Sequence, residues 1–373
     1  MEDRDLKIDV PEIPLEDYEV PEDKLETALD LQNSYEGSVD YGVIGSGQCG
    51  SRLIKSFHSI GYNKAIAVNT ASADLDPIDI PDEQKLLIGD GKGSGKSMLK
   101  GERAAEEAAQ KIFDLMRDVF GSVDKIIICA GFGGGTGAGS LSVLIEIAAK
   151  YLKFLRKEGV YKDIIVFSAL PTAGEAKSSL IGSNVSAVTD AISARVDEGK
   201  VGPVILIDNS KIEKLYRGVS PKKFWPTIND TVTGLFQTFN LLSSKPSGYT
   251  SFDAQDYQTV LSTSGLSVLG VAKVPSKDYE TVKLSQFFQE NFKKTVLLGD
   301  VDFSTAKEAA CVVLADDKIL SKISMDSINY GMDALSNLVG NATVHRGLYA
   351  SKKSGIRVYT LISGMKLKSK PVL

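Results

Sequence analysis

The segment Gly131–Ser140 is the part of this sequence best suited to hold a ligand through the backbone. Six of its ten residues are glycine, and it separates an apolar run, Lys125–Ala130, from a helical pattern. So many glycines would weaken a packed element, but they let successive backbone N–H groups approach a bound group. A helix N-terminus adds partial positive charge, and Thr136 adds a hydroxyl donor. The segment therefore predicts a polyphosphate-binding turn, since a simple strand-to-helix turn needs only one or two glycines.

A second glycine segment, Gly45–Gly50, fits the pattern GxGxxG and also lies between a predicted strand and a predicted helix. Dinucleotide-binding proteins carry this pattern, together with an acidic residue about 20 residues later that holds the ribose. Here the second strand ends in Asn69 and Thr70, so that acid is missing. An NAD-dependent oxidoreductase is therefore an alternative that leaves the first glycine segment unexplained.

The third glycine segment, Gly89–Ser97, looks like a P-loop but does not match one. The P-loop requires glycine five positions before its final Gly-Lys, and that position holds Asp90. We expect this segment to form a flap over the terminal phosphate, with Lys92 or Lys96 supplying positive charge.

Cysteine and histidine usage excludes several other site chemistries. The three cysteines, Cys49, Cys129 and Cys311, are far apart and form no CxxC pair, which favours reduced thiols over disulfides or a zinc site. With only His58 and His345, zinc hydrolases and Ser-His-Asp enzymes find no supporting motif. No apolar run reaches the length of about 18 residues that suggests a membrane span. We expect a cytoplasmic protein of a prokaryote or a phage-infected host, without membrane insertion.

Short apolar runs alternate with helical patterns from about residue 39, which predicts a doubly wound parallel sheet covered by helices on both faces. Further strands and helices after residue 249 predict a smaller second α/β unit. We expect strands at Asp40–Ile44, Ala65–Asn69, Lys85–Ile88, Lys125–Ala130, Ile164–Ala169, Val204–Ile207, Leu266–Val274, Ala310–Leu314, Thr343–Ala350 and Ile356–Ile362. We expect helices at Cys49–Ile60, Glu102–Phe120, Leu141–Lys157, Ser178–Asp197, Pro226–Ser243, Glu280–Val296 and Met325–Leu338.

The predicted organisation has five parts, and charge is uneven among them. The net charge is −5 for the whole chain, yet residues 1–36 hold 13 acidic and 3 basic side chains. The remaining body is mildly basic, which is too little to predict direct duplex DNA binding. The parts are an acidic extension at 1–36, a nucleotide-binding domain at 37–215, a central helix at 216–250, an activation domain at 251–364 and a basic tail at 365–373.

The glycine segments resemble a known family at this point. Gly133–Gly139 is similar to the GGGTG[ST]G signature of the tubulin/FtsZ superfamily, with Ala138 in place of Ser or Thr. Gly47–Gly50 is similar to the first phosphate loop of tubulins. Within the superfamily the chain looks most like the TubZ branch, which segregates plasmid and phage DNA. That likeness is carried by Val68–Thr70, Leu206–Asn209 and Phe252–Ala254.

The resemblance implies GTP or GDP as the bound nucleotide, together with Mg²⁺. No side chain is assigned as a direct metal ligand, although Gln48 is a candidate acting through a water. The residues implied for the phosphates are Gly45, Gly47, Gln48, Cys49, Gly50, Thr70, Gly93, Gly133, Gly134, Gly135, Thr136 and Gly137.

The resemblance also assigns the base and the sugar. Asn209 and Asn229 match the family asparagines that bind guanine, and Trp225 lies where an aromatic ring stacks on the base. A flat ring and an amide suit a purine and its mixed donor and acceptor edge. Glu175 matches the ribose-binding loop, and Lys177 is the expected substitute for an arginine that this chain lacks. The alternatives are that Asn209 caps a helix and that Trp225 is a core residue.

The segment Ser251–Asp256 resembles the family's acidic loop NxDxxD, with Ser251 replacing the asparagine. In the family this loop enters the nucleotide site of the next subunit. The resemblance therefore implies that Asp253 and Asp256 are catalytic residues that polarise the attacking water. The alternative is a helix-capping turn with two surface carboxylates.

Together these features predict a GTPase that stacks head to tail into a homopolymer and hydrolyses GTP at the contact between subunits. We expect it to segregate or position plasmid or phage DNA, with a DNA-binding adaptor as partner. The alternatives are an FtsZ-like division protein and a degenerate relative that binds nucleotide but only scaffolds other filaments.

Overall fold

A computed structural model describes residues 34–155, 157–215, 219–274, 281–352 and 354–367 of the chain. The strands of this part form one sheet in the order β3-β2-β1-β4-β5-β6-β7-β10-β8-β9. Their bounds are β1 Tyr41–Ser46, β2 Ala65–Asn69, β3 Lys85–Leu87, β4 Lys125–Gly131, β5 Ile164–Leu170, β6 Pro203–Asp208, β7 Gly265–Val274, β8 Glu308–Asp316, β9 Thr343–Ser351 and β10 Ile356–Met365.

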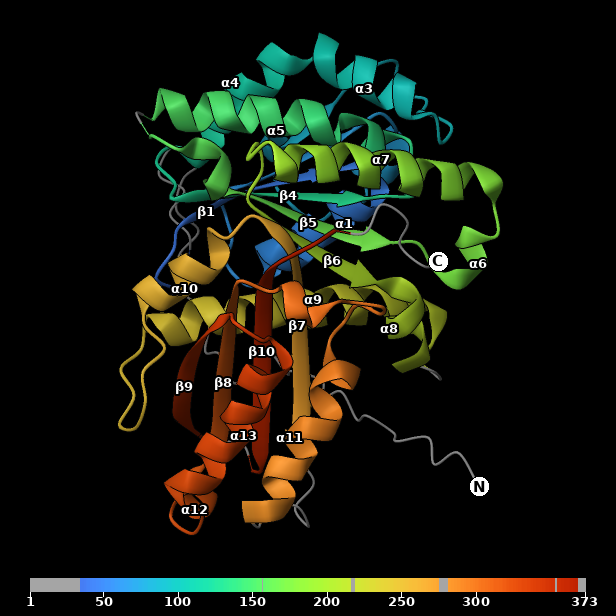
Figure 1. Cartoon of the computed structure of the whole chain (residues 1–373). Helices are drawn as coiled ribbons and strands as arrows, with labels where there is room; N and C mark the ends of the chain where they lie inside the picture. The colour runs from blue at the N-terminus through green and yellow to red at the C-terminus, as the bar shows by residue number, and fades with distance from the viewer. Residues whose placement is uncertain (1–33, 156, 216–218, 275–280, 353, 368–373) are drawn as a thin grey trace.

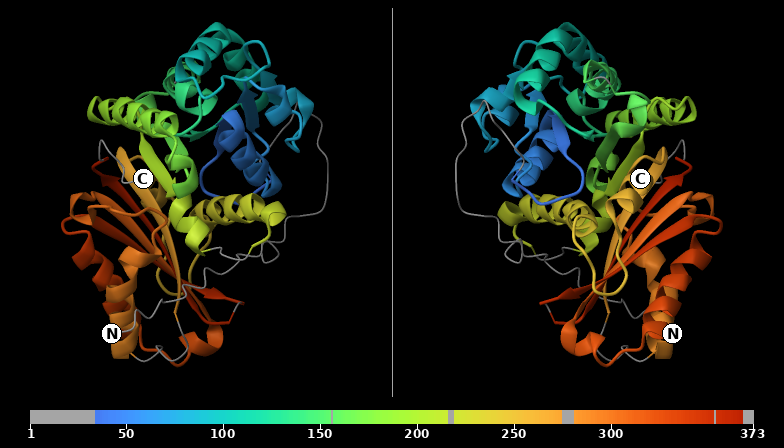
Figure 2. Two further views of the ribbon diagram at one scale, coloured as in Figure 1. Left: turned by 90° about the vertical axis from the view of Figure 1, so that its right-hand side faces the viewer. Right: turned by 90° about the vertical axis from the view of Figure 1, so that its left-hand side faces the viewer.

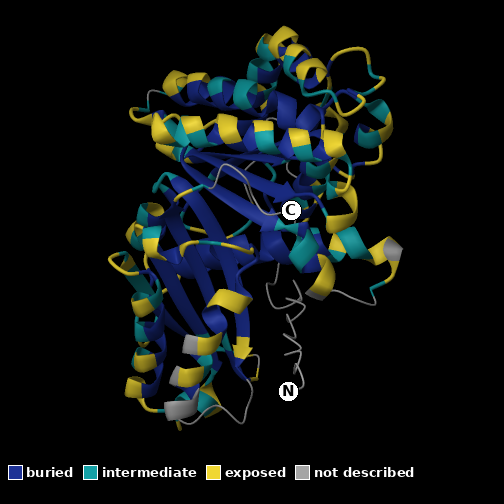
Figure 3. Cartoon of the chain, turned by 45° about the vertical axis from the view of Figure 1, so that its right-hand side comes forward, coloured by how far each residue is buried: buried dark blue, intermediate teal, exposed yellow. Residues whose placement is uncertain are grey.

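The half of the sheet from β3 to β7 is parallel, which confirms the predicted doubly wound architecture. Its strands are buried on both faces because successive side chains point to opposite sides. In β4, Ile126 and Ile128 belong to one apolar core, whereas Ile127 and Cys129 belong to the other. In Figure 3 most strand residues are buried, and the exposed residues lie mainly on the outer sides of the helices and in loops.

Helices cover both faces of this parallel half. The helices α3, α4, α5 and α7 lie on one face (Figure 1), while α1, α9 and α10 contribute to the core on the other. The bounds are α1 Gly47–Ser59, α2 Ser72–Leu75, α3 Met98–Glu107, α4 Ala109–Phe120, α5 Thr136–Phe154, α6 Ala173–Ala176, α7 Ser179–Asp197, α8 Asn209–Leu215, α9 Pro221–Ser243, α10 Ala254–Leu261, α11 Thr281–Thr295, α12 Asp317–Leu320 and α13 Met325–Leu338.

Two predicted helices need correction. The segment expected as one helix at Glu102–Phe120 is two, α3 and α4, which meet at Ala108. The helix expected from Leu141 begins five residues earlier, at Thr136, inside the glycine segment. Its first turn is poor in helix-favouring residues and is held instead by packing, since Thr136, Gly137 and Gly139 are buried.

The C-terminal part extends the same sheet instead of forming a separate one. Strand β7 pairs in parallel with β6 and antiparallel with β10, so the hydrogen-bonded ladder runs through both parts. The helices α11 and α13 pack together beside this half of the sheet. All strands predicted after residue 249 are present, but their continuity with the nucleotide-binding half was not predicted.

The helix α9 lies between the two halves of the molecule (Figure 2). It begins at Pro221, five residues before the predicted Pro226, which the helix accommodates in its interior. Its buried polar side chains hold the chain that enters β1. The Asn240 side chain accepts from Val39 N at 3.0 Å and donates to Val39 O at 3.2 Å.

The predicted acidic extension at 1–36 lies outside the described residues except for 34–36, and the predicted basic tail lies outside them from residue 368. Strand β10 ends at Met365, one residue beyond the predicted domain boundary. Within the described ranges, no helix combines the length and apolar character needed to span a bilayer.

Candidate functional site

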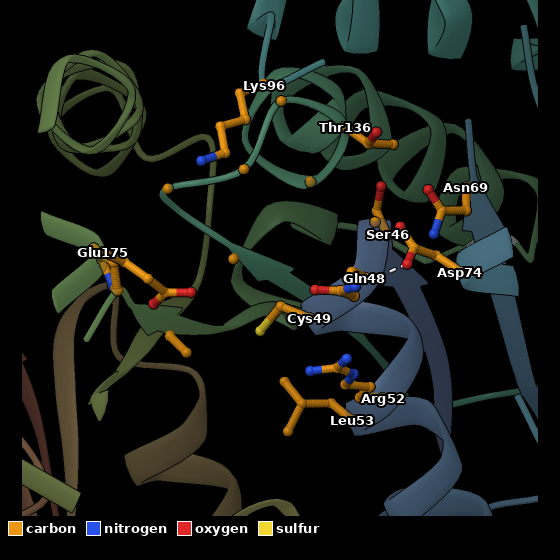
Figure 4. A pocket seen from close by; sticks show the side chains of 18 of the residues that line it. Ser46, Gln48, Cys49, Arg52, Leu53, Asn69, Asp74, Lys96, Thr136 and Glu175 are labelled. Carbon is orange, nitrogen blue, oxygen red and sulfur yellow. Dashed lines mark hydrogen bonds between the residues drawn. The ribbon is translucent and has the colours of Figure 1, made fainter. Parts of the chain in front are cut away.

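A cavity of about 480 Å³ opens at the carboxyl ends of β1 and β4 (Figure 4). The strand order 3-2-1-4-5-6 reverses its direction of winding between β1 and β4, and this is where doubly wound sheets bind ligands. The lining residues are Ser46, Gly47, Gln48, Cys49, Arg52, Leu53, Asn69, Ala71, Asp74, Lys92, Gly93, Ser94, Gly95, Lys96, Gly131, Gly133, Gly134, Gly135, Thr136, Gly137, Ala169, Leu170, Pro171, Glu175, Ile181, Ile207, Asn209, Trp225, Ile228, Asn229 and Val232.

The glycines of the β1–α1 turn have different structural roles. Gly47 lines the cavity with φ +68°, and a Cβ there would lie 2.8 Å from Gly137 N. Gly45 and Gly50 do not line the cavity, so the prediction that they contact phosphate needs correction. They permit close packing, since a Cβ on Gly50 would lie 2.2 Å from Cys129 O and one on Gly45 would lie 2.5 Å from Gly50 O.

The β4–α5 turn brings the predicted Gly133, Gly134, Gly135, Thr136 and Gly137 to the cavity wall. Its helix begins at Thr136, so the free N–H groups of the first turn lie at the cavity. This arrangement favours an anionic group.

A hydroxyl cluster sits behind this turn. Thr136 Oγ1 lies 2.6 Å from Thr70 Oγ1 and 3.1 Å from Ser94 Oγ. Thr70 itself does not line the cavity, contrary to the prediction that it contacts phosphate. It supports Thr136 instead, so its effect on a ligand is indirect.

The predicted flap lies against the cavity, where Lys92, Gly93 and Lys96 all line it. Lys96 has φ +65°, a left-handed conformation that is uncommon outside glycine. Asn184, which the sequence reasoning missed, fixes the flap, because its Nδ2 donates to Lys96 O at 2.9 Å and to Gly133 O at 3.3 Å. One side chain from α7 thus joins the flap to the glycine turn.

Asn69 is a second residue that the prediction missed. It is 1% exposed, lines the cavity and accepts a hydrogen bond from Ala71 N on its Oδ1, yet its Nδ2 has no hydrogen-bond partner among the residues that the structure describes. An unpaired buried donor costs about 1–3 kcal/mol, so a ligand acceptor is the expected compensation. The signal in the sequence was its place at the end of β2, where it was noted only because a dinucleotide-binding protein would have an acidic residue there.

Gln48 and Asp74 provide the oxygen ligands in the cavity that suit a magnesium ion. Gln48 Nε2 donates to Asp74 Oδ1 at 2.8 Å (Figure 4), which leaves the Gln48 amide oxygen and Asp74 Oδ2 for other partners. Mg²⁺ prefers oxygen ligands and usually retains several waters beside phosphate. In the part of the chain that is described, no group of three or more metal-binding side chains occurs. These residues therefore fit a metal held mainly by phosphate and water.

The far side of the cavity contains the predicted base and ribose residues. Asn209, Trp225, Asn229 and Glu175 line it, but Lys177 does not, so its predicted contact needs correction. Glu175 Oε2 accepts from Thr172 N at 2.9 Å within a capping box.

The alternative role of Asn209 as a helix cap is not supported. The start of α8 is capped by Asp208, whose Oδ1 accepts from Ser210 N at 2.8 Å and from Lys211 N at 3.2 Å. The Asn209 amide is thus not needed to cap this helix, and Asn209 lines the cavity.

Cys49 and Arg52 lie next to each other on α1 at the cavity wall (Figure 4). Burial raises the pKa of the Cys49 thiol to about 11, and Arg52 opposes that rise. The thiol is therefore neutral at physiological pH, which suits packing against an anionic ligand. Arg52, which the prediction missed, adds a fixed positive charge.

Asp253 and Asp256 do not line the cavity. They begin α10 as a capping box, in which Asp253 Oδ1 accepts from Asp256 N at 2.9 Å and Asp256 Oδ2 accepts from Asp253 N at 3.2 Å. The capping alternative is therefore present in the structure. It leaves Asp253 exposed and, within the described residues, its Oδ2 without a hydrogen-bond partner.

The acids and the cavity lie near opposite ends of the parallel strands. The cavity is at the carboxyl ends of the parallel strands, whereas α10 leads into the amino end of β7, which pairs with the amino end of β6. In Figure 1, α10 lies to the left of the sheet, and α6 and α8 lie to the right. In this structure the acids are therefore apart from the cavity of their own chain.

Known proteins resemble this chain in sequence and in fold. The tubulin-like protein CetZ of Pyrococcus abyssi is 28% identical over 333 residues, covering 87% of this chain and 85% of the relative. A GTPγS-form protofilament of TubZ from Bacillus thuringiensis serovar israelensis has a TM-score of 0.77 at 17% identity, covering 90% of each chain. CetZ2 of Haloferax volcanii in a GTPγS-bound protofilament has a TM-score of 0.72 at 20% identity, covering 89% of this chain and 95% of that one.

The likeness to TubZ is one of fold, while the 28% identical relative is CetZ, so the TubZ branch stays a prediction. Residues 41–217 match the description "Tubulin/FtsZ family, GTPase domain". This range runs from β1 into α8 and supplies every lining residue except Trp225, Ile228, Asn229 and Val232. Because the matched residues build most of the cavity wall, residues 41–217 of this chain form a GTPase domain of the tubulin/FtsZ family.

Proposed function

We propose that this protein is a filament-forming GTPase whose hydrolysis is completed by contact between two copies. The observation that carries the proposal is the placement of the nucleotide cavity and the Asp253–Asp256 pair near opposite ends of the parallel strands. GTP occupies the cavity, and the acids come from the adjoining subunit.

The binding side of the proposal rests on the cavity wall. The α5 N-terminus, the free Asn69 Nδ2 and the cations Lys92, Lys96 and Arg52 suit a triphosphate. Trp225, Asn209 and Asn229 line the other side and suit guanine, as the family resemblance implies. Two neighbours captured with GTPγS support the same ligand.

Each acid that lines the cavity holds a neighbouring residue through one of its oxygens. Among the described residues these are Asp74, bonded to Gln48, and Glu175, bonded to Thr172. In the proposal Asp74 holds the metal together with Gln48, and Glu175 stays in its capping box, so the base for the attacking water comes from another copy. Asp253 is exposed and keeps an unbonded oxygen, so it suits the site of another copy.

Such a contact joins two different surfaces, and a contact of that kind repeats into an open filament unless its rotation closes a ring. The protofilaments described for CetZ2 and TubZ support this mode of assembly. Hydrolysis then follows assembly, because a lone subunit has neither Asp253 nor Asp256 at its own cavity.

Magnesium is part of the proposal. Gln48 and Asp74 would hold it from the protein side, either directly or through water. When bound, the metal neutralises charge on the phosphates. The protein's own residues bind and orient the nucleotide, and the adjoining copy positions the water.

The test is GTP turnover measured over a range of protein concentrations, together with sedimentation and electron microscopy. Turnover per subunit should rise steeply once filaments form. The Asp253→Ala variant should assemble with GTP into persistent filaments and lose about 10²-fold or more of its turnover, as expected when a general base is removed.

Three results would contradict this proposal. Turnover that is proportional to protein concentration throughout would show that a lone subunit hydrolyses GTP. Filaments without turnover in the unchanged protein would favour the degenerate scaffold alternative, and a preference for NAD over GTP would favour the oxidoreductase.

For the cellular role, we propose segregation or positioning of DNA through an adaptor. The fold likeness to TubZ supports it, whereas an FtsZ-like division role is the competing candidate. Removal of the protein from its host should raise the share of daughter cells that lack the DNA, with normal cell length. Elongated cells that fail to divide would instead support the division role.

A further inference from the structure

His345 connects one of the proposed catalytic carboxylates to a second acidic side chain. It lies on β9, with its side chain 14% exposed, and Nδ1 is 2.7 Å from Asp256 Oδ1. On the other side, Nε2 is 3.0 Å from Glu308 Oε2, at the start of β8. Asp256 and Glu308 are also partly buried, at 28% and 21% exposed. This imidazole is the bridge between α10 and the first residues of the β8–β9 pair.

The two ring nitrogens of His345 each face a carboxylate oxygen. A proton on Nδ1 allows the ring to donate to Asp256, and a proton on Nε2 allows it to donate to Glu308. The ring therefore lies within hydrogen-bond distance of both carboxylates and links α10 to the first residues of β8.

We infer that His345 is a positioning residue for Asp256 in the GTPase reaction at the subunit contact, an inference that rests on the proposed function. Asp256 Oδ2 accepts from Asp253 N, and Oδ1 lies 2.7 Å from His345 Nδ1, so both carboxylate oxygens have a partner. The capping box alone holds one oxygen and leaves the carboxylate free to rotate about it. His345 removes that freedom and sets the direction in which Asp256 faces the adjoining subunit.

The fold does not depend on this bridge, which separates positioning from structural support. The helix α10 keeps its capping box and buries Tyr257, Val260 and Leu261 without His345. Tyr349, which is also on β9, holds Phe252, the residue before Asp253, since its Oη accepts from Phe252 N at 2.9 Å. Loss of His345 should therefore change the carboxylate orientation more than the stability.

Two variants divide the role of the ring by the position of its nitrogens. In His345→Asn the amide nitrogen takes roughly the place of Nδ1 and still reaches Asp256. In His345→Gln it extends to roughly the place of Nε2 and reaches Glu308 instead. We expect the Asn variant to keep turnover per assembled subunit within about threefold of the unchanged protein. The Gln and Ala variants should lose about tenfold or more, because small displacements of a reacting group are costly.

The matched control is Arg346→Gln. Arg346 is the next residue on β9, and it bonds Asp333 at 2.6 Å on the other face of the sheet. It should leave turnover per assembled subunit unchanged while losing a comparable ion pair. GTPγS binding, thermal unfolding and the critical concentration for assembly are measured for every variant.

The proposal is supported if kcat falls in the Gln and Ala variants but is retained in the Asn variant. The critical concentration and the GTPγS affinity should stay within about twofold of the unchanged protein in all three. It is overturned if all three His345 variants retain turnover, or if Asn and Gln lose it equally. These outcomes are interpreted only where the unchanged protein shows turnover that rises with assembly. If it does not, the proposed function has failed, and that failure is visible before any variant is compared.

Discussion

At the scale of single residues, the glycine segments contain residues with unrelated roles. Gly47 is required by its backbone conformation at the cavity wall. Gly45 and Gly50 are required because a side chain would strike backbone atoms of the sheet and helix. A GxGxxG pattern therefore combines ligand contact and packing, and only the structure separates the two.

The unpaired amide of Asn69 gives the first residue-scale prediction. The Asn69→Ala variant should bind GTPγS more weakly by about 1.5–3 kcal/mol, or roughly ten- to 150-fold, because it loses a donor to a charged group. Equilibrium titration measures this change. The Thr70→Ala variant is the comparison, since Thr70 only supports Thr136, and it should have a smaller effect. Equal losses in the two variants would contradict the direct role of Asn69.

Much of the site could be predicted because glycine-rich turns and the family asparagines are visible as residue types at fixed spacing. Asn69 and Asn184 were missed because an asparagine has no distinctive spacing until burial leaves its donor unpaired or places it beside three carbonyl groups. Lys177 was assigned by its proximity to Glu175 in the chain. The start of α7 at Ser179 left it outside the residues that line the cavity.

At the scale of elements, the contact between α3 and α5 sets the position of the phosphate turn. A Cβ on Gly139 would lie 2.1 Å from Met98 O, and one on Gly101 would lie 2.4 Å from Gly135 O. The two helices thus meet backbone to backbone, directly behind the first turn of α5. This contact could not be predicted, because the sequence does not show that α3 crosses the glycine segment.

This contact gives an element-scale prediction. The Gly139→Ala variant should lose about 1–3 kcal/mol of unfolding free energy, because backbone atoms must move to admit the methyl group. The Gly182→Ala variant in α7 is the control, since a Cβ there has no atom within 4 Å. That control should gain about 0.5–1 kcal/mol from helix propensity. Chemical denaturation compares them, and a harmless Gly139→Ala would contradict the packing account.

At the scale of the whole molecule, the alternation of strands and helices was sufficient to predict the parallel half. The continuity of the sheet across the two halves was not predicted, because the β6–β7 pairing depends on residues far apart in the chain. Apolar periodicity marks strands but does not identify their neighbours. The result is one sheet whose inner strands are buried in both halves, including the thiols of Cys129 and Cys311.

These thiols predict how stability depends on pH. Burial raises the pKa of Cys311 from 9.0 to about 12, and it raises that of Cys129 well above its ordinary value. Folding favours the protonated thiol, so this contribution is fully present below about pH 9 and is lost as the pH rises towards the folded value. At pH 10.5 the Cys311 thiol alone should lower the unfolding free energy by about 2 kcal/mol, and Cys129 acts in the same direction.

Urea denaturation at pH 8 and pH 10.5 measures this loss. Buried tyrosines contribute in the same direction, since burial also raises the pKa of Tyr41 and Tyr257. The Cys311→Ala variant has a different stability at both pH values, but its loss between them should be smaller by about 2 kcal/mol. An unchanged loss would show that Cys311 does not carry this pH dependence.

Because the cavity and the acids lie near opposite ends of the parallel strands, the two ends of such a filament should differ in nucleotide hydrolysis and exchange. Under the proposed assembly, one tip presents an open nucleotide pocket and the other presents unused carboxylates, so the two tips are chemically unlike. At the first tip no adjoining subunit supplies Asp253 and Asp256 to the pocket. The nucleotide there is therefore not hydrolysed and is free to exchange. Each newly arriving copy ends that protection for the copy it covers. The filament therefore keeps uncleaved GTP in the subunit at one end and accumulates GDP in the subunits behind it.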